Sequence, residues 1–390
     1  MMFRTLHPHL RVQLCMPESC PNHDLIDNVR LALVPGVGPR LRKALLERFG
    51  SSAAIWAATK SDLQSVDGIG PKIAASILES RDSVDAEAEL RLAAEHDIDV
   101  LTETDAEYPR LLREIHDPPG VLFRLGKSQP QDELAIAIVG TRHATRYGLA
   151  QAERLSGSLA RVGFTIVSGL ARGIDAAAHR GALAAGGRTI AVLASGLLEI
   201  YPPEHKSLAE EVAANGYVVS EAPPRMAPIS GAFPQRNRII SGISVGTIVI
   251  EAPLRSGSLI TSRHAYEQGR EVFAVPGPID SRMSHGCHAL IKDGAKLVES
   301  VDDVLAELGP LVEHIERADG TIVSQPAELT LNEIEQKVLA AIDGQPTSVD
   351  AVAAAAGLPI HRVLSTISVL EMRRLVRKIS GTQVVRCQFA

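Results

Sequence analysis

The sequence predicts a Rossmann-like α/β core, a doubly wound parallel sheet, with a helical unit before it and a small separate unit after it. Six apolar runs that fit strands alternate with amphipathic helical runs, at 134–139, 164–167, 189–193, 217–220, 247–251 and 271–275. This alternation is typical of parallel strands that are joined by helices. Residues 134–300 carry 17 basic and 13 acidic side chains, whereas residues 1–133 carry 15 and 21. We therefore expect an anion site in the central domain.

Length and composition set the broad class. The 390 residues are 45% hydrophobic and 3% aromatic, which predicts two or three domains with aliphatic cores. No apolar run approaches the ~20 residues that span a bilayer, so we expect no membrane insertion. The four cysteines have neither zinc spacing nor the density of a disulfide scaffold, which favours a cytoplasmic location. Residues 1–24 contain three prolines without periodicity, and we expect a disordered tail that is not a signal peptide.

Residues 25–104 are expected to form a helical domain with two similar turns. The turns read PGVGPR at 35–40 and DGIGPK at 67–72, each between helical runs. The arrangement resembles a tandem helix-hairpin-helix, or SAM-like, unit. In such a turn glycine lets backbone amides approach a phosphate, because it lacks a Cβ. The same turns also suit a domain that only contacts protein, and the sequence leaves both readings open. A connecting segment at 105–126 then leads into the core, which we expect to span 105–305.

The C-terminal part is expected to hold a linker at 306–329 and a separate domain at 330–390. Three helical runs followed by the ribbon-like VRKISGTQVVRCQF indicate a winged helix. Arg362 lies near the start of the third helix, where a recognition helix would touch DNA. Many small winged helices bind only protein, so either partner fits the sequence.

The candidate binding residues follow the strands of the core. A strand that opens into a helix gathers free backbone amides and the positive end of the helix dipole, and arginine adds a planar fork that suits phosphate. Lys206 follows the third strand and could meet a phosphate as a point charge. The full set of candidates is Gly140, Thr141, Arg142, Ser168, Gly169, Arg172, Gly173, Lys206, Arg236, Asn237, Arg238, Ser256, Gly257, Ser258 and Thr261.

Several titratable residues lie near these candidates. Asp175 and His179 are four residues apart on one helix, and we interpret them as structural groups that orient a loop. Glu221 and Glu251 end two strands, where paired carboxylates could hold Mg²⁺ or act as acid and base. Beside so many arginines we expect them to pair with Arg236 or Arg238 instead. We therefore expect no catalytic residue, no metal and no cofactor, and we expect at least one of the two arginines to be a buried structural partner.

Seven ordered motifs between about 117 and 297 resemble the DNA-processing protein A family (DprA, also called Smf). They are DPPGVLFRLG, AIVGTRHATRYG, VSGLARGIDAAAHRGAL, TIAVLASGLLEIYPPEH, FPQRNRIISGIS, VIEAPLRSGSLITSRHAYEQGREVFAVPGPI and GCHALIKDGAK. Thr141 and His205 depart from the residues commonest in the family. The resemblance implies a non-enzymatic protein that binds single-stranded DNA, protects it during natural transformation and helps to load RecA recombinase. It also implies a homodimer formed through the central domain.

Two enzyme classes are the alternatives. A nucleotide phosphoribohydrolase of related fold needs a PGGxGTxxE motif, and the corresponding stretch here reads PGPIDSRMSHGC, without the second glycine and the glutamate. A DNA repair glycosylase would need a catalytic aspartate after the second hairpin, where Asp82 and Asp85 stand, and an aromatic pocket. A dinucleotide enzyme is disfavoured because no GxGxxG follows the first strand.

Overall fold

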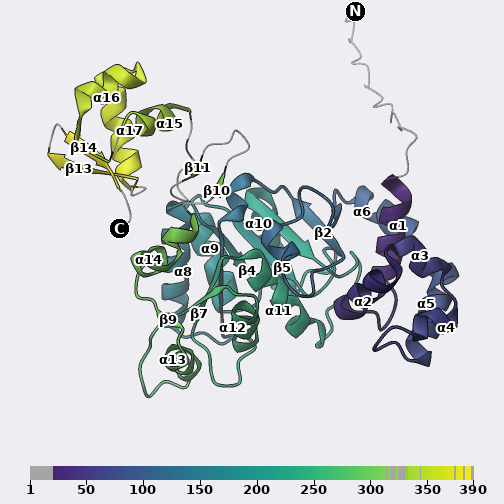
Figure 1. The fold of residues 1–390 in the computed structure, drawn as a ribbon. Coiled ribbons are helices and arrows are strands. Elements are labelled where there is room, and N and C mark those ends of the chain that lie inside the picture. Colours follow the sequence, from purple (N-terminus) through teal and green to yellow (C-terminus); the bar gives the residue numbers. More distant parts are fainter. Residues whose placement is uncertain are drawn as a thin grey trace, which may run out of the picture.

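The computed structural model describes residues 21–312, 315–316, 322–323, 331, 333–342, 344–372, 375–380 and 383–387. Figure 1 shows a central α/β domain, a helical unit that precedes it and a small C-terminal domain. The fold class predicted from the sequence is confirmed. Residues 1–20 of the expected tail and most of the expected linker lie outside the described residues.

The N-terminal unit is helical from Pro21 to Glu95. A cluster of buried aliphatic side chains forms its core around Leu45, Ile55 and Ile77. Both expected turns precede helices that begin with proline, a residue whose fixed φ suits the first helical position. The helices are α1 (Pro21–Ala32), α2 (Pro39–Phe49), α3 (Ser52–Ala57), α4 (Lys60–Gln64), α5 (Pro71–Ser83) and α6 (Ala86–Glu95).

A nine-stranded sheet in the order β1-β2-β6-β5-β4-β3-β7-β8-β9 forms the central domain. Strands β3 to β9 are parallel to one another, whereas β2 pairs in an antiparallel way with both β6 and β1 at one edge. The strands are β1 (Asp99–Thr102), β2 (Val121–Gly126), β3 (Ala135–Gly140), β4 (Thr165–Ser168), β5 (Thr189–Leu193), β6 (Gly216–Ser220), β7 (Gly246–Ile250), β8 (Glu271–Ala274) and β9 (Lys296–Leu297).

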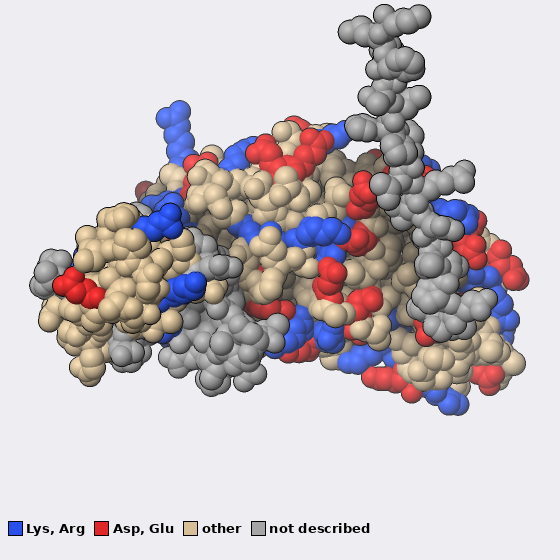
Figure 2. Space-filling view, turned by 90° about the horizontal axis from the view of Figure 1, so that it is seen from above, with Lys and Arg blue, Asp and Glu red and all other residues tan. Residues whose placement is uncertain are grey.

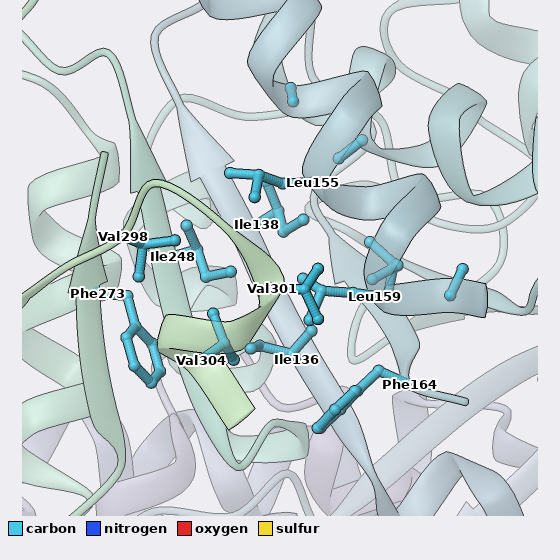
Figure 3. Packing of buried hydrophobic residues seen from close by; sticks show 14 of the residues in the cluster. Ile136, Ile138, Leu155, Leu159, Phe164, Ile248, Phe273, Val298, Val301 and Val304 are labelled. Carbon is cyan, nitrogen blue, oxygen red and sulfur yellow. The ribbon is translucent and has the colours of Figure 1, made fainter. Parts of the chain in front are cut away.

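Helices cover both faces of this sheet because alternate residues of the buried strands point to opposite sides. On one face Ile136, Ile138 and Ile248 pack against α8, α9 and α14, as Figure 3 shows for Leu155, Leu159, Val301 and Val304. On the other face the strands pack against α7, α11, α12 and α13. The helices are α7 (Arg110–Arg113), α8 (Arg146–Arg161), α9 (Ile174–Ala184), α10 (Lys206–Asn215), α11 (Ala232–Ile243), α12 (Ser258–Glu267), α13 (His285–Lys292) and α14 (Val301–Val312).

The C-terminal domain has its own buried core, which includes Val352, Val363 and Leu370. Three helices and a three-stranded sheet in the order β12-β14-β13 form the predicted winged helix. Its elements are α15 (Glu333–Ala340), β12 (Thr347–Ser348), α16 (Val349–Ala356), α17 (Ile360–Met372), β13 (Val376–Ser380) and β14 (Gln383–Arg386). A two-stranded pair, β10 (Ile315–Glu316) and β11 (Ile322–Val323), lies in the segment before it.

The boundaries expected from the sequence need correction. Strand β1 belongs to the sheet of the core and not to the helical domain expected at 25–104, and β2 makes the connecting segment expected at 105–126 part of the sheet. Helix α14 runs to Val312 and packs into the core, so residues 306–312 are no linker. Helix α1 begins at Pro21, within the expected tail.

Candidate nucleic-acid interface

The point where the strand order reverses marks the candidate site. From β3 the chain continues to β4, β5 and β6 on one side and then returns to place β7 and β8 on the other. In open parallel sheets such a switch leaves a crevice outside the carboxyl ends of the strands. A pocket of about 390 Å³ opens there, bordered by the ends of β3 and β7 and the first turns of α11 and α12. We call it the strand-end pocket.

Most of the residues predicted to bind an anion lie together in this pocket. It also contains Phe233 and His143, which the sequence analysis did not select. A Phe one helical turn before Arg236 in FPQRNR is the signal that could have identified Phe233. The predicted residues that line the pocket are Gly140, Thr141, Arg142, Arg236, Asn237, Ser256, Gly257, Ser258 and Thr261.

Arg142 combines a cation with an aromatic face at this pocket. Its side chain is exposed, and its guanidinium lies over the ring of Phe233, 4.9 Å from the ring centroid. Phe233 meets Tyr201 edge to face, with the ring centroids 5.8 Å apart. Arg172 in turn lies over Tyr201 and pairs with Glu204 at 2.5 Å. We call the side chains of Arg142, Phe233, Tyr201 and Arg172 the aromatic row. They offer a guanidinium for phosphate beside an aromatic surface for a base.

Arg236 is the buried cation at the back of the pocket. One terminal nitrogen donates hydrogen bonds to the carbonyl oxygens of Gly169, at 2.7 Å, and of Val192. Burial lowers the pKa of the guanidinium to about 10, while the nearby carboxylate of Asp175 acts in the opposite direction. Because a Cβ at residue 169 would collide with this guanidinium, Gly169 makes room for Arg236. Gly169 therefore acts here through packing.

Strained backbone holds the loops around the pocket. Leu170 and Glu251, which follow β4 and β7, have φ of 56° and 49°, in the left-handed region that side chains other than glycine seldom adopt. Gly173 has φ of 77°, and a Cβ there would collide with the carbonyl of Thr141. The amide of Ile174 donates to that same carbonyl at 3.3 Å. These contacts bring the loops after β3 and β4 together.

The start of α12 contributes amides and hydroxyls. The N-cap residue, Gly257, has no side chain, and the amide of Ser258 donates instead to the hydroxyl of Ser256 at 3.3 Å. The hydroxyls of Ser256 and Ser258 hydrogen-bond to each other at 2.7 Å, and Asn237 donates to the carbonyl of Gly257 at 3.2 Å. The positive end of the α12 dipole therefore faces the pocket beside Arg142 and Arg236.

Arg238 and Ser168 prove to be structural. Arg238 is buried, and its guanidinium forms ion pairs with Glu221 at 2.9 Å and Asp117 at 3.2 Å. Ser168 is fully buried and donates its hydroxyl to the carbonyl of Ile138 at 2.6 Å. Positions 236 and 238 are two residues apart on α11, so their side chains leave the helix in different directions. The expectation of a buried structural arginine is met by Arg238.

Only one of the two expected carboxylate pairings is present. Glu221 pairs with Arg238 as expected, but Glu251 accepts from the amide of Thr145 at 2.8 Å and from its hydroxyl at 2.5 Å. The expected pairing of Glu251 with Arg236 or Arg238 is wrong, because Glu251 turns toward the start of α8. Both carboxylates are thus engaged in holding the architecture of the site.

Asp175 and His179 do not contact each other. Asp175 is buried and accepts from the amides of Gly169, at 3.1 Å, and Ala171, at 3.4 Å, which orients the loop after β4 as expected. Burial raises the pKa of Asp175, and the charge of Arg236 opposes this rise. His179 is buried against Thr189, with Nδ1 2.7 Å from the hydroxyl oxygen. Burial lowers its pKa to about 3.

The two hairpin turns of the helical unit differ in what they face. Residues of the first turn line a side hollow of about 190 Å³ together with residues that follow β5 and β6. Arg42, on α2, seals this contact by pairing with Glu103 and packing over Gly120, where a Cβ would collide with it. The second turn, at Asp67–Gly70, lines a shallow surface hollow with residues of its own segment alone. The first turn therefore borders the core, whereas the second turn faces solvent apart from it.

Charge on the remaining surface is mixed. Figure 2 shows one face, on which blue and red side chains are interspersed over the central domain. Within the described ranges no group of three or more His, Cys, Asp or Glu side chains is placed to hold a metal ion. Among the described helices none alone has the length and apolar character of a membrane span. Helices α16 and α17 have the required length and apolar character only when they are counted together, and the chain bends by 106° between them.

Fold and site together define a Rossmann-like protein with a pocket lined by Arg142 and Arg236 at the switch point of its sheet. The family model described as DNA recombination-mediator protein A matches residues 99–309. A SAM-like helix-hairpin-helix tandem matches residues 29–83, and a DprA winged helix domain matches residues 323–382. The chain belongs to the DNA recombination-mediator protein A (DprA/Smf) family.

Relatives and a solved structure agree with this assignment. Protein Smf of Synechocystis sp. is 38% identical over 90% of this chain and 96% of its own length. DNA processing protein DprA of Bacillus subtilis is 45% identical over 55% of this chain and 72% of its own length. The X-ray structure of DNA processing protein A from Streptococcus pneumoniae matches with a TM-score of 0.63 at 38% identity. The match covers 72% of this chain and 96% of the Streptococcus pneumoniae chain.

Proposed function

We propose that this protein binds single-stranded DNA in the strand-end pocket and acts there as a recombination mediator without catalysing a reaction. The observation that carries the proposal is the exposed guanidinium of Arg142 over the ring of Phe233, next to the start of α12. A phosphate would be held by Arg142 and by the positive end of the α12 dipole, and a base would stack on the aromatic row. Duplex DNA offers phosphates but keeps its bases stacked, so it satisfies only half of this arrangement.

The downstream role follows from the family. We propose that the bound strand is protected in the cytoplasm during natural transformation and that the protein helps to load RecA recombinase onto it. We propose no cofactor and no metal for this protein in either step. Within the proposed site, Gly140, Thr141, Arg142, Arg236, Asn237, Ser256, Gly257, Ser258 and Thr261 line the pocket. Arg172 and Lys206 would contact the strand outside it.

We also propose a homodimer formed through the central domain. Support comes from the side of the domain opposite the helical unit in the strand order, where β9 ends the sheet. Tyr266 is 79% exposed there and Leu297 45% exposed, beside a hollow of about 800 Å³ lined by α12 and α13. Two linked DNA sites would raise avidity for a long strand. Light scattering of the full chain at micromolar concentration should give twice the monomer mass, and a monomer would remove this part of the proposal.

Binding of matched labelled oligonucleotides tests the main proposal. Single strands should bind more tightly than the duplex, and the affinity should fall as salt rises because phosphate contacts release counterions. The recovered DNA should be intact, with neither strands nor bases cleaved. Equal affinity for both forms at moderate salt, or cleavage of the DNA, would count against a single-strand mediator. RecA-dependent strand exchange on DNA coated with single-strand-binding protein tests the loading step, which the full chain should accelerate.

A further inference from the structure

Three exposed arginines lie outside the strand-end pocket on neighbouring loops. Arg146 begins α8 after β3, Arg255 follows β7, and Arg282 follows β8. We call them the outer arginines. None of them belongs to the residues assigned above to the DNA site.

Hydrogen bonds hold the loops of the outer arginines side by side. Tyr147, next to Arg146, donates its hydroxyl to the carbonyl of Pro276 at 2.7 Å, which joins the start of α8 to the loop after β8. The amide of Gly286, at the start of α13, donates to the carbonyl of Ala252 at 2.7 Å. The loops after β3, β7 and β8 therefore form one continuous surface at the carboxyl edge of the sheet.

This surface carries more positive than negative charge, and its three arginines have no ion-pair partner among the described residues. None of the outer arginines forms an ion pair with a described carboxylate, whereas exposed Arg91 and Arg110 elsewhere pair with two carboxylates each. Glu251 is turned inward to Thr145, and Asp280 is the carboxylate of the loop after β8. Unpaired, exposed guanidinium groups on adjoining loops suit a polyanion that spans several charges.

Two apolar side chains stand among the outer arginines. Leu254 is 63% exposed on the loop after β7, and Ile279 is 86% exposed on the loop after β8. Unstacked bases offer apolar faces to such side chains, and a duplex does not. Arginines interleaved with exposed aliphatic groups therefore fit a single strand.

The fold also gives the strand a direction in which to leave the pocket. The strand-end pocket, at about 390 Å³, is far smaller than an oligonucleotide. On the side of β5 the strand would meet exposed Arg172 and Lys206, and beyond them the helical unit borders the side hollow of about 190 Å³. The loops after β7 and β8 border the pocket on its other side, because β7 pairs with β3 and β8 pairs with β7.

We infer that a single strand of DNA bound in the strand-end pocket continues over the loops after β7 and β8. Its phosphates contact the outer arginines, and its bases contact Leu254 and Ile279. This inference rests on the proposed function, because it extends the same bound strand. It assigns a second contact surface to residues that lie outside the pocket.

A length series of oligothymidylates bound to the full chain tests the inference. We expect the affinity of the wild-type protein to rise with length beyond what the pocket alone can hold. Arg255→Gln combined with Arg282→Gln should leave the shortest binding oligonucleotides unaffected. The affinity for long ones should fall roughly 10- to 30-fold at 0.1 M salt, and the slope of log affinity against log salt should become shallower by about 1.4, because two single-strand phosphate contacts are lost.

Matched variants control for general charge and for the apolar contacts. Arg91→Gln combined with Arg110→Gln removes the same charge from exposed, ion-paired positions and should leave the affinity for long strands nearly unchanged. Leu254→Ser combined with Ile279→Ser should weaken binding of long strands without changing the salt slope. Thermal melting should be the same for all variants, because the substituted side chains are exposed.

The possible failures of the two proposals can be told apart. If long strands bind the Arg255→Gln/Arg282→Gln variant as they bind the wild type, with the same salt slope, the further inference is overturned and the pocket remains. If short and long strands lose affinity equally in this variant, the outer arginines act on the pocket and the inferred second contact surface is wrong. If no oligonucleotide of any length binds the wild-type protein, both the proposed function and the second contact surface are overturned.

Discussion

Arginines at the two edges of the parallel sheet differ in whether a carboxylate pairs with them. At the amino edge, Arg188 pairs with Asp132 at 2.8 Å, and Arg124, on β2, pairs with Asp99 at 2.8 Å and Glu107 at 2.6 Å. At the carboxyl edge, Arg142 and the outer arginines have no carboxylate partner among the described residues. At the amino edge these arginines thus stabilise the fold, whereas at the carboxyl edge buried Arg238 does so and the exposed, unpaired arginines are available to a ligand.

Strand direction explains this difference. The carboxyl ends of the strands open into helix N-termini, where amides and dipoles already favour an anion, so an unpaired arginine there adds to a binding site. The amino ends offer no such site, and a cation buried there needs a carboxylate to offset its desolvation. Position relative to strand direction and exposure together therefore separate structural from functional arginines, because buried Arg238 is structural although it lies at the carboxyl edge.

The largest expected effect comes from the amino edge. Arg188→Ala would leave the buried carboxylate of Asp132 without its guanidinium partner. Removing one member of a buried pair costs about 3–5 kcal/mol of folding stability. Urea unfolding should show this loss, whereas the protein that remains folded should bind single-stranded DNA normally. Arg161→Ala, at an exposed neighbouring position, is the control and should change the free energy of unfolding little. Weak DNA binding by folded Arg188→Ala would show that the amino edge also takes part in binding and would contradict the comparison.

The next effect is a pH dependence that also belongs to the amino edge, where His179 contacts Thr189 at the start of β5. Burial lowers the pKa of His179 from 6.5 to about 3. Between these two pH values the imidazole is therefore protonated in the unfolded chain and neutral in the folded protein. Stability is therefore complete above about pH 6.5 and falls toward about pH 3, by up to about 1.4 kcal/mol per pH unit. Urea titrations at several pH values should lose this component in His179→Leu. An unchanged pH profile would show that the buried imidazole is not its source.

At the carboxyl edge, Arg142→Ala should act on binding and not on folding. The variant loses a charge-assisted contact to phosphate, and we expect about 1–3 kcal/mol weaker binding of single-stranded DNA. Its melting temperature should change little, because the side chain is exposed and without an ion pair. Arg142→Lys keeps the charge and loses the planar fork, so it should restore only part of the affinity. If Arg142→Ala binds normally while folded Arg238→Ala does not, the site lies elsewhere along the strand ends.

Phe233 should give the smallest of these effects. Phe233→Leu keeps an apolar side chain and removes the ring. We expect about 1 kcal/mol weaker binding, at the lower end for base–aromatic stacking, since Arg142 already covers one side of the ring. Affinity measured over a salt series should shift by a constant amount without a change of slope. A changed slope would mean that Phe233 acts by positioning Arg142.

The sequence was sufficient for the fold class and for much of the pocket. Strands that end in glycine, serine and arginine before a helix identify one edge of a parallel sheet, and nine of the fifteen predicted residues line the pocket there. The antiparallel pair β1 and β2 was missed because the VLFRLG run contains Arg124. That arginine is tolerated in β2 only because Asp99 and Glu107, distant in sequence, neutralise it.

The individual roles within FPQRNR could not be read from the sequence. Arg236 and Arg238 are both buried, and which one faces the pocket depends on how α11 lies against β3, β4 and β5. Glu221 and Asp117, which hold Arg238, come from segments far apart in the sequence. The stack of Arg142 on Phe233 likewise joins loops that are distant along the chain, so local patterns could not reveal it.

The salt dependence of single-stranded DNA binding, measured for Arg142→Ala and Arg188→Ala beside the wild-type protein, tests the contrast between the two edges most directly. Loss of one phosphate contact should make the slope of log affinity against log salt shallower by about 0.7 for Arg142→Ala. The slope for folded Arg188→Ala should equal that of the wild type. A slope that changes for Arg188→Ala but not for Arg142→Ala would contradict the account and move the DNA to the opposite edge of the sheet.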